Sequence, residues 1–295
     1  MSPLITVIIA TYNSAKTLKW ALHSVQQQEF QDFEVRVIGD ACTDSSETVV
    51  ASFNDPRFHW KNLHSNVGSQ NGPNNQGLMD ALGAYVAYLG HDDLWFPWHL
   101  SNLLTCLEKN NADFVFSLCS IFSPAGIQNP MGPAFIDQKT FETRFAPPSS
   151  WMHKKELIHT CGFWTCDMEK LKQPIDVEFW QQIVKQKKNF HFCPALSVLK
   201  FPSPYWNSYK RAENYPQEPF LDQLFHHPKQ LQTQILQDLV SHLNKQIRYR
   251  HYGKHWLLKL LQFYGVDRFP LHQLLFWYFH KKRKKIRLQR GLENA

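Results

Sequence analysis

The chain has 295 residues, 43% of them hydrophobic, which suits one large globular domain or a domain with an appendage and excludes a small disulfide-dependent scaffold. Its net charge of +7 comes from residues 281–290, which hold seven basic and no acidic side chains, so the other 25 basic residues balance the 25 acidic ones. This distribution gives no indication of a nucleic-acid groove across the fold and favours one local anionic partner near residue 290. Six cysteines without a Cys-x-x-Cys pair, and an N-terminus without a cleavable signal pattern, predict reduced thiols and a cytoplasmic protein.

The first half of the chain alternates strand-like and helix-like segments. Short apolar runs rich in β-branched residues predict strands, and apolar residues at helical spacing, such as Leu18, Leu22 and Val25, predict helices. Strands are expected over residues 4–10, 33–38, 58–62, 85–89 and 113–118. Helices are expected around residues 18–25, from Asp44 to about Phe53, near Leu82 after a polar loop at 66–77, and over about 98–109. The alternation predicts a mostly parallel sheet covered by helices.

Polar side chains follow three of these strands where each strand ends. Thr11, Tyr12 and Asn13 follow the first strand, Asp40 the second, and Asp92 with Asp93 the fourth. Ligands of open α/β sheets lie outside the carboxyl ends of the strands. Two adjacent carboxylates suit Mg²⁺ or Mn²⁺, which prefer oxygen ligands and are commonly shared with substrate phosphates. The set predicts a nucleotide diphosphate site, although Asp92 and Asp93 could instead only cap the helix that begins near Trp98.

Five motifs carry a family resemblance when they are taken together and in order. They are Val7-Ile-Ile-Ala-Thr-Tyr-Asn13, Val37-Ile-Gly-Asp-Ala-Cys-Thr-Asp44, Asn66-Val-Gly-Ser, Asn74-Asn-Gln-Gly77 and Tyr88-Leu-Gly-His-Asp-Asp93 with Pro97. In order and spacing the chain resembles glycosyltransferase family 2 over about residues 4–200. The resemblance implies a GT-A fold, which is a Rossmann-like, mostly parallel α/β sheet flanked by helices, in a catalytic domain at 1–205. It also implies a nucleotide-sugar donor, with a UDP-sugar favoured, and inversion at the anomeric carbon.

The resemblance also gives individual positions their expected roles. Asp93, helped by Asp92, would hold Mg²⁺ or Mn²⁺ on the diphosphate. His91 could be a third ligand for a softer ion such as Zn²⁺, or a polar group that orients the turn. Gly90 stands where the family often has an acidic residue. The nucleotide-sugar would contact Ala10, Thr11, Tyr12, Asn13, Asp40, Asn66, Gly68, Asn75 and Asp92.

An inverting transfer needs a base that takes the proton of the acceptor hydroxyl. Family members place an acidic pair before an aromatic-rich helix, and the matching stretch here is Pro174-Ile-Asp-Val-Glu-Phe-Trp180. Asp176 falls at the catalytic position, and Glu178 stands two residues later. The base could therefore be either carboxylate, with Asp176 preferred.

Residues 206–295 are expected to form a helical C-terminal extension. Its part at 256–290 mixes large apolar side chains with basic ones and has no stretch of about 18 apolar residues that could span a bilayer. It could lie on an anionic membrane surface, pack on the catalytic domain, or contact a protein or nucleic acid. Membrane contact would place the chain peripherally on the inner face of the plasma membrane.

The resemblance leaves the acceptor open as a glycan, a lipopolysaccharide or a lipid-linked saccharide, with no nucleic acid expected. Two other function classes remain open from the residues. A metal-dependent phosphohydrolase could use His91 and Asp92, and a binding protein could retain the fold with a degenerate site.

Overall fold

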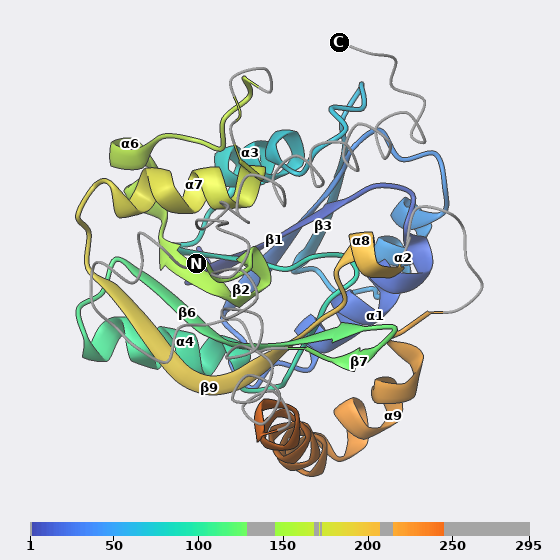
Figure 1. Ribbon diagram of the computed structural model, residues 1–295. Coiled ribbons are helices and arrows are strands. Elements are labelled where there is room, and N and C mark those ends of the chain that lie inside the picture. Colours follow the sequence, from blue (N-terminus) through green and yellow to red (C-terminus); the bar gives the residue numbers. More distant parts are fainter. Residues whose placement is uncertain (1, 129–144, 168–170, 172, 207–214, 245–295) are drawn as a thin grey trace, which may run out of the picture.

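The computed structural model describes residues 2–128, 145–167, 171, 173–206 and 215–244. They form a nine-stranded sheet with helices on both faces (Figure 1). The strand order is β3-β2-β1-β4-β8-β6-β9-β5, with β7 paired to β6 at the side. The mixed α/β architecture agrees with the expected fold class.

The N-terminal part of the sheet is parallel throughout. Its strands are β1 (Ile5–Thr11), β2 (Phe33–Gly39), β3 (Phe58–Asn62) and β4 (Tyr85–Tyr88). The strands β2 and β4 flank β1 in parallel register, and β3 pairs with β2. Each predicted strand lies within one residue of the observed one. Because these strands run the same way, the residues that follow them meet at one edge of the sheet.

The other half of the sheet is mixed in direction. It consists of β5 (Leu94–Trp95), β6 (Phe114–Ser123), β7 (Gly126–Ile127), β8 (Trp151–Lys154) and β9 (Phe190–Lys200). The strand β8 is inserted antiparallel between β4 and β6, with Ala87 opposite Met152. This register brings the 3₁₀ turn η1 (Pro148–Ser150), just before β8, to the end of β4.

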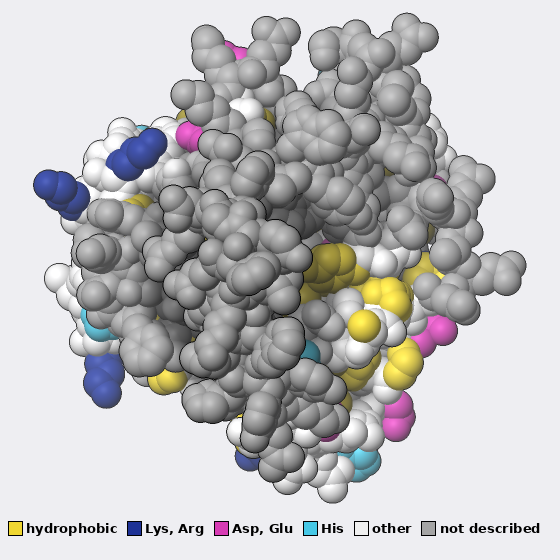
Figure 2. Space-filling view, viewed as in Figure 1, with side chains coloured by type: hydrophobic (Ala, Val, Ile, Leu, Met, Phe, Trp, Pro, Cys, Tyr) yellow, Lys and Arg dark blue, Asp and Glu magenta, His cyan; other side chains and the backbone are white. Residues whose placement is uncertain are grey.

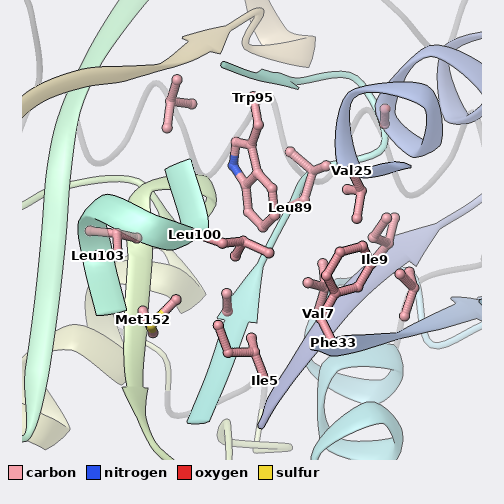
Figure 3. Packing of buried hydrophobic residues seen from close by; sticks show 14 of the residues in the cluster. Ile5, Val7, Ile9, Val25, Phe33, Leu89, Trp95, Leu100, Leu103 and Met152 are labelled. Atoms are coloured by element: carbon pink, nitrogen blue, oxygen red, sulfur yellow. The ribbon is translucent and has the colours of Figure 1, made fainter. Parts of the chain in front are cut away.

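Helices of the two faces enclose two separate cores. One face carries α1 (Ala15–Gln26), α2 (Ser46–Ser52) and α4 (His99–Lys109), and the other carries α3 (Asn71–Asp80), α6 (Ile158–Cys161) after the 3₁₀ turn η2 (Lys155–Leu157), and α7 (Ile175–Val184). Val7 and Ile9 of β1 point into the first core (Figure 3), and Ile8 points into the second. This is the period-two alternation of a sheet that is buried on both faces. Full burial of one such side chain stabilises the fold by about 1.5–3 kcal/mol.

The helix α3 corrects the sequence interpretation of residues 66–82. The stretch interpreted as a polar loop is itself helical from Asn71, and Leu82, where a helix was predicted, lies after its end and is 57% exposed. The helix α3 packs closely against β1 because Gly77 of α3 faces Ile8 of β1. A Cβ added at Gly77 would come within 2.5 Å of Ile8 Cγ2. A helix that packs through glycine shows no apolar periodicity, so the pattern could not reveal it.

The C-terminal described helices pack on the sheet rather than standing apart from it. They are α8 (Ser203–Trp206), α9 (Glu218–His226) and a helix over 228–244. Leu224, Leu231 and Ile235 join a third core with Leu199 of β9. No helix in the described ranges is long and apolar enough to cross a bilayer. The division at 205 stays a prediction, and the basic segment 256–290 lies outside the described residues.

The described surface carries charges of both signs. In the space-filling view, Lys and Arg side chains lie on the left and Asp and Glu side chains gather on the lower right, near α9 (Figure 2). In the part of this face that the structure describes, no continuous basic groove is visible. The basic segment itself lies outside the described residues, so a neutral body with a basic end stays a prediction.

Candidate functional site

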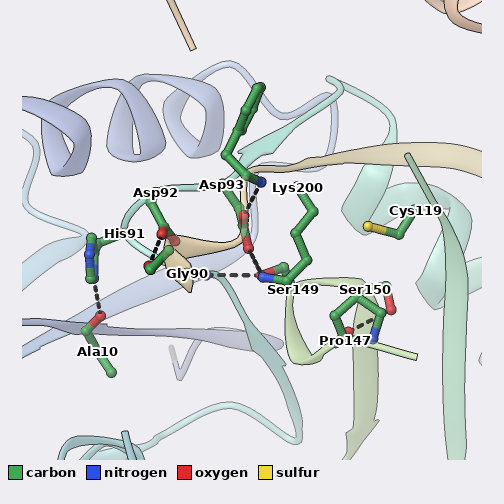
Figure 4. A network of polar contacts seen from close by, with 12 residues as sticks. Ala10, Gly90, His91, Asp92, Asp93, Cys119, Pro147, Ser149, Ser150 and Lys200 are labelled. Carbon is green, nitrogen blue, oxygen red and sulfur yellow. Dashed lines mark hydrogen bonds and ion pairs between the residues drawn. The ribbon is translucent and has the colours of Figure 1, made fainter. Parts of the chain in front are cut away.

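The residues that follow β1, β2 and β4 are joined by direct contacts. The Asp40 N–H donates to the Thr11 carbonyl at 2.8 Å, which ties the end of β2 to the end of β1. His91 Nδ1 lies 3.1 Å from the Ala10 carbonyl oxygen, which ties the loop after β4 to the same strand (Figure 4). The structure therefore brings together the three strand ends from which the sequence predicts a site.

Asp40 holds the loop that follows β3. Its side chain is 2% exposed, Oδ1 accepts from the Val67 N–H at 2.7 Å, and Oδ2 accepts from the Gly68 N–H at 2.9 Å. Gly68 has φ of 73°, a left-handed conformation that glycine adopts without strain. Asp40 thus fixes the loop that contains Asn66, whereas its contact with a base or ribose stays a prediction.

Asn13 connects the loops after β1 and β2. It has φ of 44°, and its Oδ1 accepts from the Thr43 N–H at 2.7 Å. Asp44 Oδ2 accepts in turn from the Ala15 N–H at the start of α1, at 2.9 Å. The side chains of Asn13 and Asp44 therefore stabilise the walls of the site.

The side-chain amide of Asn75, predicted to contact the nucleotide, forms hydrogen bonds with the main chain of Trp164. Its Nδ2 donates to the Trp164 carbonyl at 2.8 Å, and its Oδ1 accepts from the Trp164 N–H at 2.9 Å. Asn71 Nδ2 donates to the Thr165 carbonyl at 2.9 Å. Both asparagines therefore hold the segment at 164–165 against α3.

Asp93 is buried and surrounded by hydrogen-bond donors (Figure 4). Its side chain has no exposed surface, and Lys200 Nζ lies 2.7 Å from Oδ2. The Phe201 N–H donates to Oδ1 at 3.0 Å, and the Ser149 hydroxyl donates to Oδ2. Burial opposes the charge of Lys200, but the carboxylates of Asp93 and Asp92 outweigh it and raise the pKa of Lys200 above its ordinary value. The two carboxylates therefore favour the charged form of Lys200 beside Asp93.

Asp92 keeps one carboxylate oxygen open. Its side chain is 8% exposed, and the Ser203 hydroxyl donates to Oδ2 at 2.5 Å. Gln217 Nε2 donates to the Asp92 main-chain carbonyl at 2.8 Å, so α9 and α8 both support this loop. Among the described residues, Oδ1 accepts no hydrogen bond.

The two carboxylates have different surroundings, while the expected division of labour between them stays a prediction. The sequence interpretation gives Asp93 most of the metal binding, but its oxygens are used by Lys200, Ser149 and the Phe201 N–H. Asp92 Oδ1 is the better placed of the two for a cation. Within the described ranges, no group of three or more His, Cys, Asp or Glu side chains could hold a metal by itself. One carboxylate together with substrate phosphates is still a sufficient ligand set for Mg²⁺ or Mn²⁺.

Gly90 lies close to both carboxylates of this loop. A Cβ at position 90 would lie 2.8 Å from Asp93 Oδ2 and 3.1 Å from Asp92 Oδ1. The Gly90 N–H also donates to Ser149 Oγ at 3.1 Å. A side chain at this position would therefore require the Asp93 carboxylate, which Lys200, Ser149 and the Phe201 N–H hold, to move.

Three polar side chains near these strand ends have buried atoms without a partner in the described part of the chain. They are Thr11 through Oγ1, Asn66 through both amide atoms, and His91 through Nε2. A buried polar group without a partner costs about 1–3 kcal/mol, so native proteins seldom keep several of them together. Four of the ten such atoms in the described residues belong to these three side chains, and a polar ligand at this edge would give them partners.

The two candidate bases lie in the first turn of α7. Asp176 and Glu178 are both half-buried, and Gln173 Nε2 donates to Glu178 Oε2 at 2.9 Å. The helix is anchored by Phe179, whose ring stacks on Trp164 with centroids 4.4 Å apart. The resemblance implies an acidic pair before the helix, whereas the structure has both carboxylates within its first turn, and their role as base stays a prediction.

Sequence reasoning missed Ser149, Lys200 and Ser203. They contact the Asp92-Asp93 pair from positions 56 to 111 residues further along the chain. A lysine as the last residue of a long, mostly apolar strand was the only local signal for Lys200, and it resembles an ordinary strand end.

The chain is similar to known proteins in sequence and in structure. Residues 6–171 match the model of Glycosyl transferase family 2. A Campylobacter jejuni protein named GalNAc(5)-diNAcBac-PP-undecaprenol beta-1,3-glucosyltransferase is 32% identical over 210 residues, which cover 67% of this chain and 65% of the relative. The chain spans less than two thirds of the length of this and other curated relatives that it matches.

Solved structures share the fold at lower identity. S. aureus TarS 1-349 in complex with UDP-GlcNAc has a TM-score of 0.59 and 19% identity, over 72% of this chain and 60% of TarS. The Pyrobaculum calidifontis mannosyltransferase PcManGT in complex with GDP-Man and Mn²⁺ has a TM-score of 0.54 and 17% identity, over 99% of this chain and 84% of that one. These likenesses show the expected GT-A architecture. With more than half of its residues matching the family model, the chain belongs to glycosyl transferase family 2.

Proposed function

We propose that the protein is an inverting glycosyltransferase that moves a sugar from a nucleotide diphosphate donor to a hydroxyl acceptor. The observation that carries this proposal is that Thr11, Asn66 and His91, at the ends of β1 and β4 and in the loop that Asp40 holds, keep buried polar atoms without a partner among the described residues. A nucleoside diphosphate offers ribose hydroxyls, base edges and phosphate oxygens to such groups. Membership of the family supports the same reaction class.

The donor would lie along the carboxyl edge of β1, β2 and β4. The base would contact the loop from Ala10 to Asn13 and the loop that Asp40 holds through Val67 and Gly68. A UDP-sugar is the favoured donor, since the structural neighbour TarS was crystallised with UDP-GlcNAc. Asn75 would act indirectly, by holding the segment at Trp164.

Mg²⁺ or Mn²⁺ would be held by Asp92 Oδ1 together with phosphate oxygens of the donor. When bound, the ion neutralises charge on the departing nucleoside diphosphate, a contribution of several kcal/mol to the transition state. The ion pair of Asp93 with Lys200 would stabilise the loop that carries Asp92. The complex of a structural neighbour with GDP-Man and Mn²⁺ supports a divalent ion.

Asp176 would be the base, with Glu178 as the alternative. The acceptor oxygen attacks the anomeric carbon while the bond from that carbon to the diphosphate oxygen breaks, and the carboxylate takes the hydroxyl proton. One displacement inverts the configuration. The half-buried position in the first turn of α7 leaves room for contact with an acceptor.

The acceptor would be a glycan or a lipid-linked saccharide. The name of the Campylobacter jejuni relative includes a saccharide on diphosphoundecaprenol, which supports a lipid-linked acceptor. Contact of residues 256–290 with an anionic membrane surface would bring the protein to such an acceptor. This places the proposed activity in cell-envelope polysaccharide synthesis.

The test is donor turnover by the purified chain. The protein is incubated with Mn²⁺, a panel of nucleotide-sugars and either a soluble sugar or an undecaprenyl diphosphate saccharide, and released nucleoside diphosphate is measured. We expect release with one donor and its stimulation by acceptor. Absence of nucleotide binding by calorimetry, together with absence of donor hydrolysis, would reject the proposal.

A further inference from the structure

Two cysteines from distant parts of the sequence lie together where α4 packs on β9 (Figure 1). Cys106 belongs to the last turn of α4, and Cys193 belongs to β9. Cys193 Sγ lies 3.8 Å from the Asn102 carbonyl oxygen, and in an α-helix that oxygen accepts from the N–H four residues later, which here is the Cys106 N–H. The Cys193 thiol therefore meets α4 in the turn that leads to Cys106.

The two thiols also contact each other. The Cys193 thiol donates a hydrogen bond to the Cys106 sulfur, and this bond, together with Asn110 and Lys109, lowers the pKa of Cys106 to about 7 against the opposing effect of burial. The same hydrogen bond, with burial, raises the pKa of Cys193. Asn110 Nδ2 lies 3.7 Å from Cys106 Sγ and donates to the Cys106 carbonyl at 2.7 Å. One thiol of the pair thus ionises near neutral pH while its neighbour keeps its proton.

The two thiols differ in their access to solvent. Cys193 is 6% exposed and belongs to the first core, whereas Cys106 is half-buried and packs against that core from outside. All six cysteines are free thiols in the structure. In thiol–disulfide exchange a solvent-accessible thiolate attacks first, and a second thiol beside it releases the mixed disulfide. Cys106 fits the first role and Cys193 the second.

The strand β9 is irregular next to Cys193. Its pairing with β6 passes from Ser117 opposite Cys193 to Leu118 opposite Leu196, so Pro194 and Ala195 bulge out of the ladder. A disulfide requires the two sulfurs to approach to about 2.0 Å. Because the ladder is interrupted beside Cys193, the backbone can make this small adjustment with less loss of sheet hydrogen bonds than in a regular strand.

We propose that Cys106 and Cys193 are a site of reversible oxidation, at which a small disulfide such as glutathione disulfide converts the two thiols into an intramolecular disulfide. The Cys106 thiolate attacks one sulfur of the oxidant, whose S–S bond breaks, and one glutathione leaves as a thiolate that takes up a proton from solvent. The Cys193 sulfur then attacks Cys106 Sγ, and its proton goes to the second departing glutathione. Two protein thiols are oxidised, and one glutathione disulfide is reduced to two thiols. The new bond would fasten α4 to the strand whose last residue, Lys200, pairs with Asp93.

The test treats the folded full chain with glutathione disulfide at neutral pH. The protein is then unfolded in iodoacetamide, which blocks the remaining thiols, and its peptides are mapped by mass spectrometry. We expect a disulfide between Cys106 and Cys193 that dithiothreitol reverses. Cys193→Ser should stop at a mixed disulfide of glutathione with Cys106, because the second thiol is missing, and Cys106→Ser should give neither product.

The matched control is Cys166→Ser, which removes an exposed cysteine and should form the same disulfide as wild type. Wild-type protein that keeps both thiols free, or that stops at the mixed disulfide on Cys106, would overturn the inference. A disulfide formed by other cysteines in place of this pair would overturn it as well. The wild-type map decides the question even if a variant fails to fold, and it requires no donor or acceptor, so its outcome is independent of the proposed function.

Discussion

Lys200 and Asp93 form an ion pair inside the protein, with Nζ 2.7 Å from Oδ2, although 107 positions separate them in the sequence. Asp93 is fully buried, and the Lys200 side chain is 21% exposed. The pair joins the last residue of β9 to the loop after β4. It supports the loop from which Asp92 is presented.

Replacing Lys200 by methionine should lower the free energy of unfolding by about 3–5 kcal/mol, because it leaves the buried Asp93 carboxylate without its cation. Urea unfolding followed by circular dichroism measures the change. Lys154→Met removes a more exposed ion pair with Asp113, whose atoms are 2.9 Å apart, and should cost under about 1 kcal/mol. Equal losses in the two variants would contradict a special role for the buried pair.

Substitutions of Asp92 and of Asp93 should have different effects, the first on metal-dependent binding and the second on stability. Asp92→Asn should reduce Mn²⁺-dependent affinity for UDP by about 10-fold or more while the midpoint of thermal unfolding stays near that of wild type, because Oδ1 is its open oxygen. Asp93→Asn should mainly lower the unfolding midpoint, since it disturbs the buried pair with Lys200. Calorimetry with and without Mn²⁺, combined with thermal unfolding, measures both. A stable Asp93→Asn protein that has lost all metal dependence would restore the original sequence interpretation.

Asp176→Asn should remove transfer and leave donor binding largely intact. Loss of a general base lowers turnover by about 10²–10⁴-fold, whereas the donor contacts lie on other elements. Glu178→Gln is the matched variant in the same helical turn and should keep turnover within about 10-fold of wild type. Turnover and UDP affinity are measured on both variants. A larger loss of turnover in Glu178→Gln would assign the base to Glu178.

Stability should fall as the pH drops below 6.5. Burial lowers the pKa of His153 to about 4 and that of His99 to about 3. The unfolded chain then takes up protons that the native state does not, so each histidine removes about 2 kcal/mol between pH 6.5 and 5. Urea unfolding at pH 7, 6 and 5 measures the slope. A flat profile would contradict the burial of both rings as neutral groups.

The basic segment should direct the protein to anionic surfaces. Removing residues 281–295 should weaken sedimentation with anionic liposomes, since each Lys or Arg near such a surface contributes about 1 kcal/mol. Turnover of a soluble acceptor should be unchanged. Unaltered liposome binding after the deletion would remove the membrane proposal.

Sequence patterns predicted the parts of the fold that depend on neighbours in the chain. β1 to β4 and α4 were located to within one residue, because alternating burial and helical spacing are local signals. The insertion of β8 between β4 and β6 depends on contacts between distant segments, and no periodicity encodes it. The helix α3 was missed because it packs through Gly77 rather than through an apolar face.

The candidate site was predictable in outline and not in its internal contacts. Polar residues at the ends of parallel strands identified Thr11, Asp40 and Asp92, since strand direction alone brings them to one edge. Which of two adjacent carboxylates points into the protein depends on Lys200 and Ser149, which belong to segments far along the chain. The pair of aspartates therefore looked equivalent in the sequence and is not equivalent in the structure.

The double hydrogen bond between Asn75 and the Trp164 main chain couples two walls of the site mechanically. Asn75 belongs to α3, and Trp164 stacks on Phe179 of α7, so a rigid chain of contacts connects the two helices. The proposed nucleotide loop and the proposed base thus share one support. A substitution at Asn75 would loosen the contact of α3 with the Trp164 segment, and with it the support that the proposed nucleotide loop and the proposed base share.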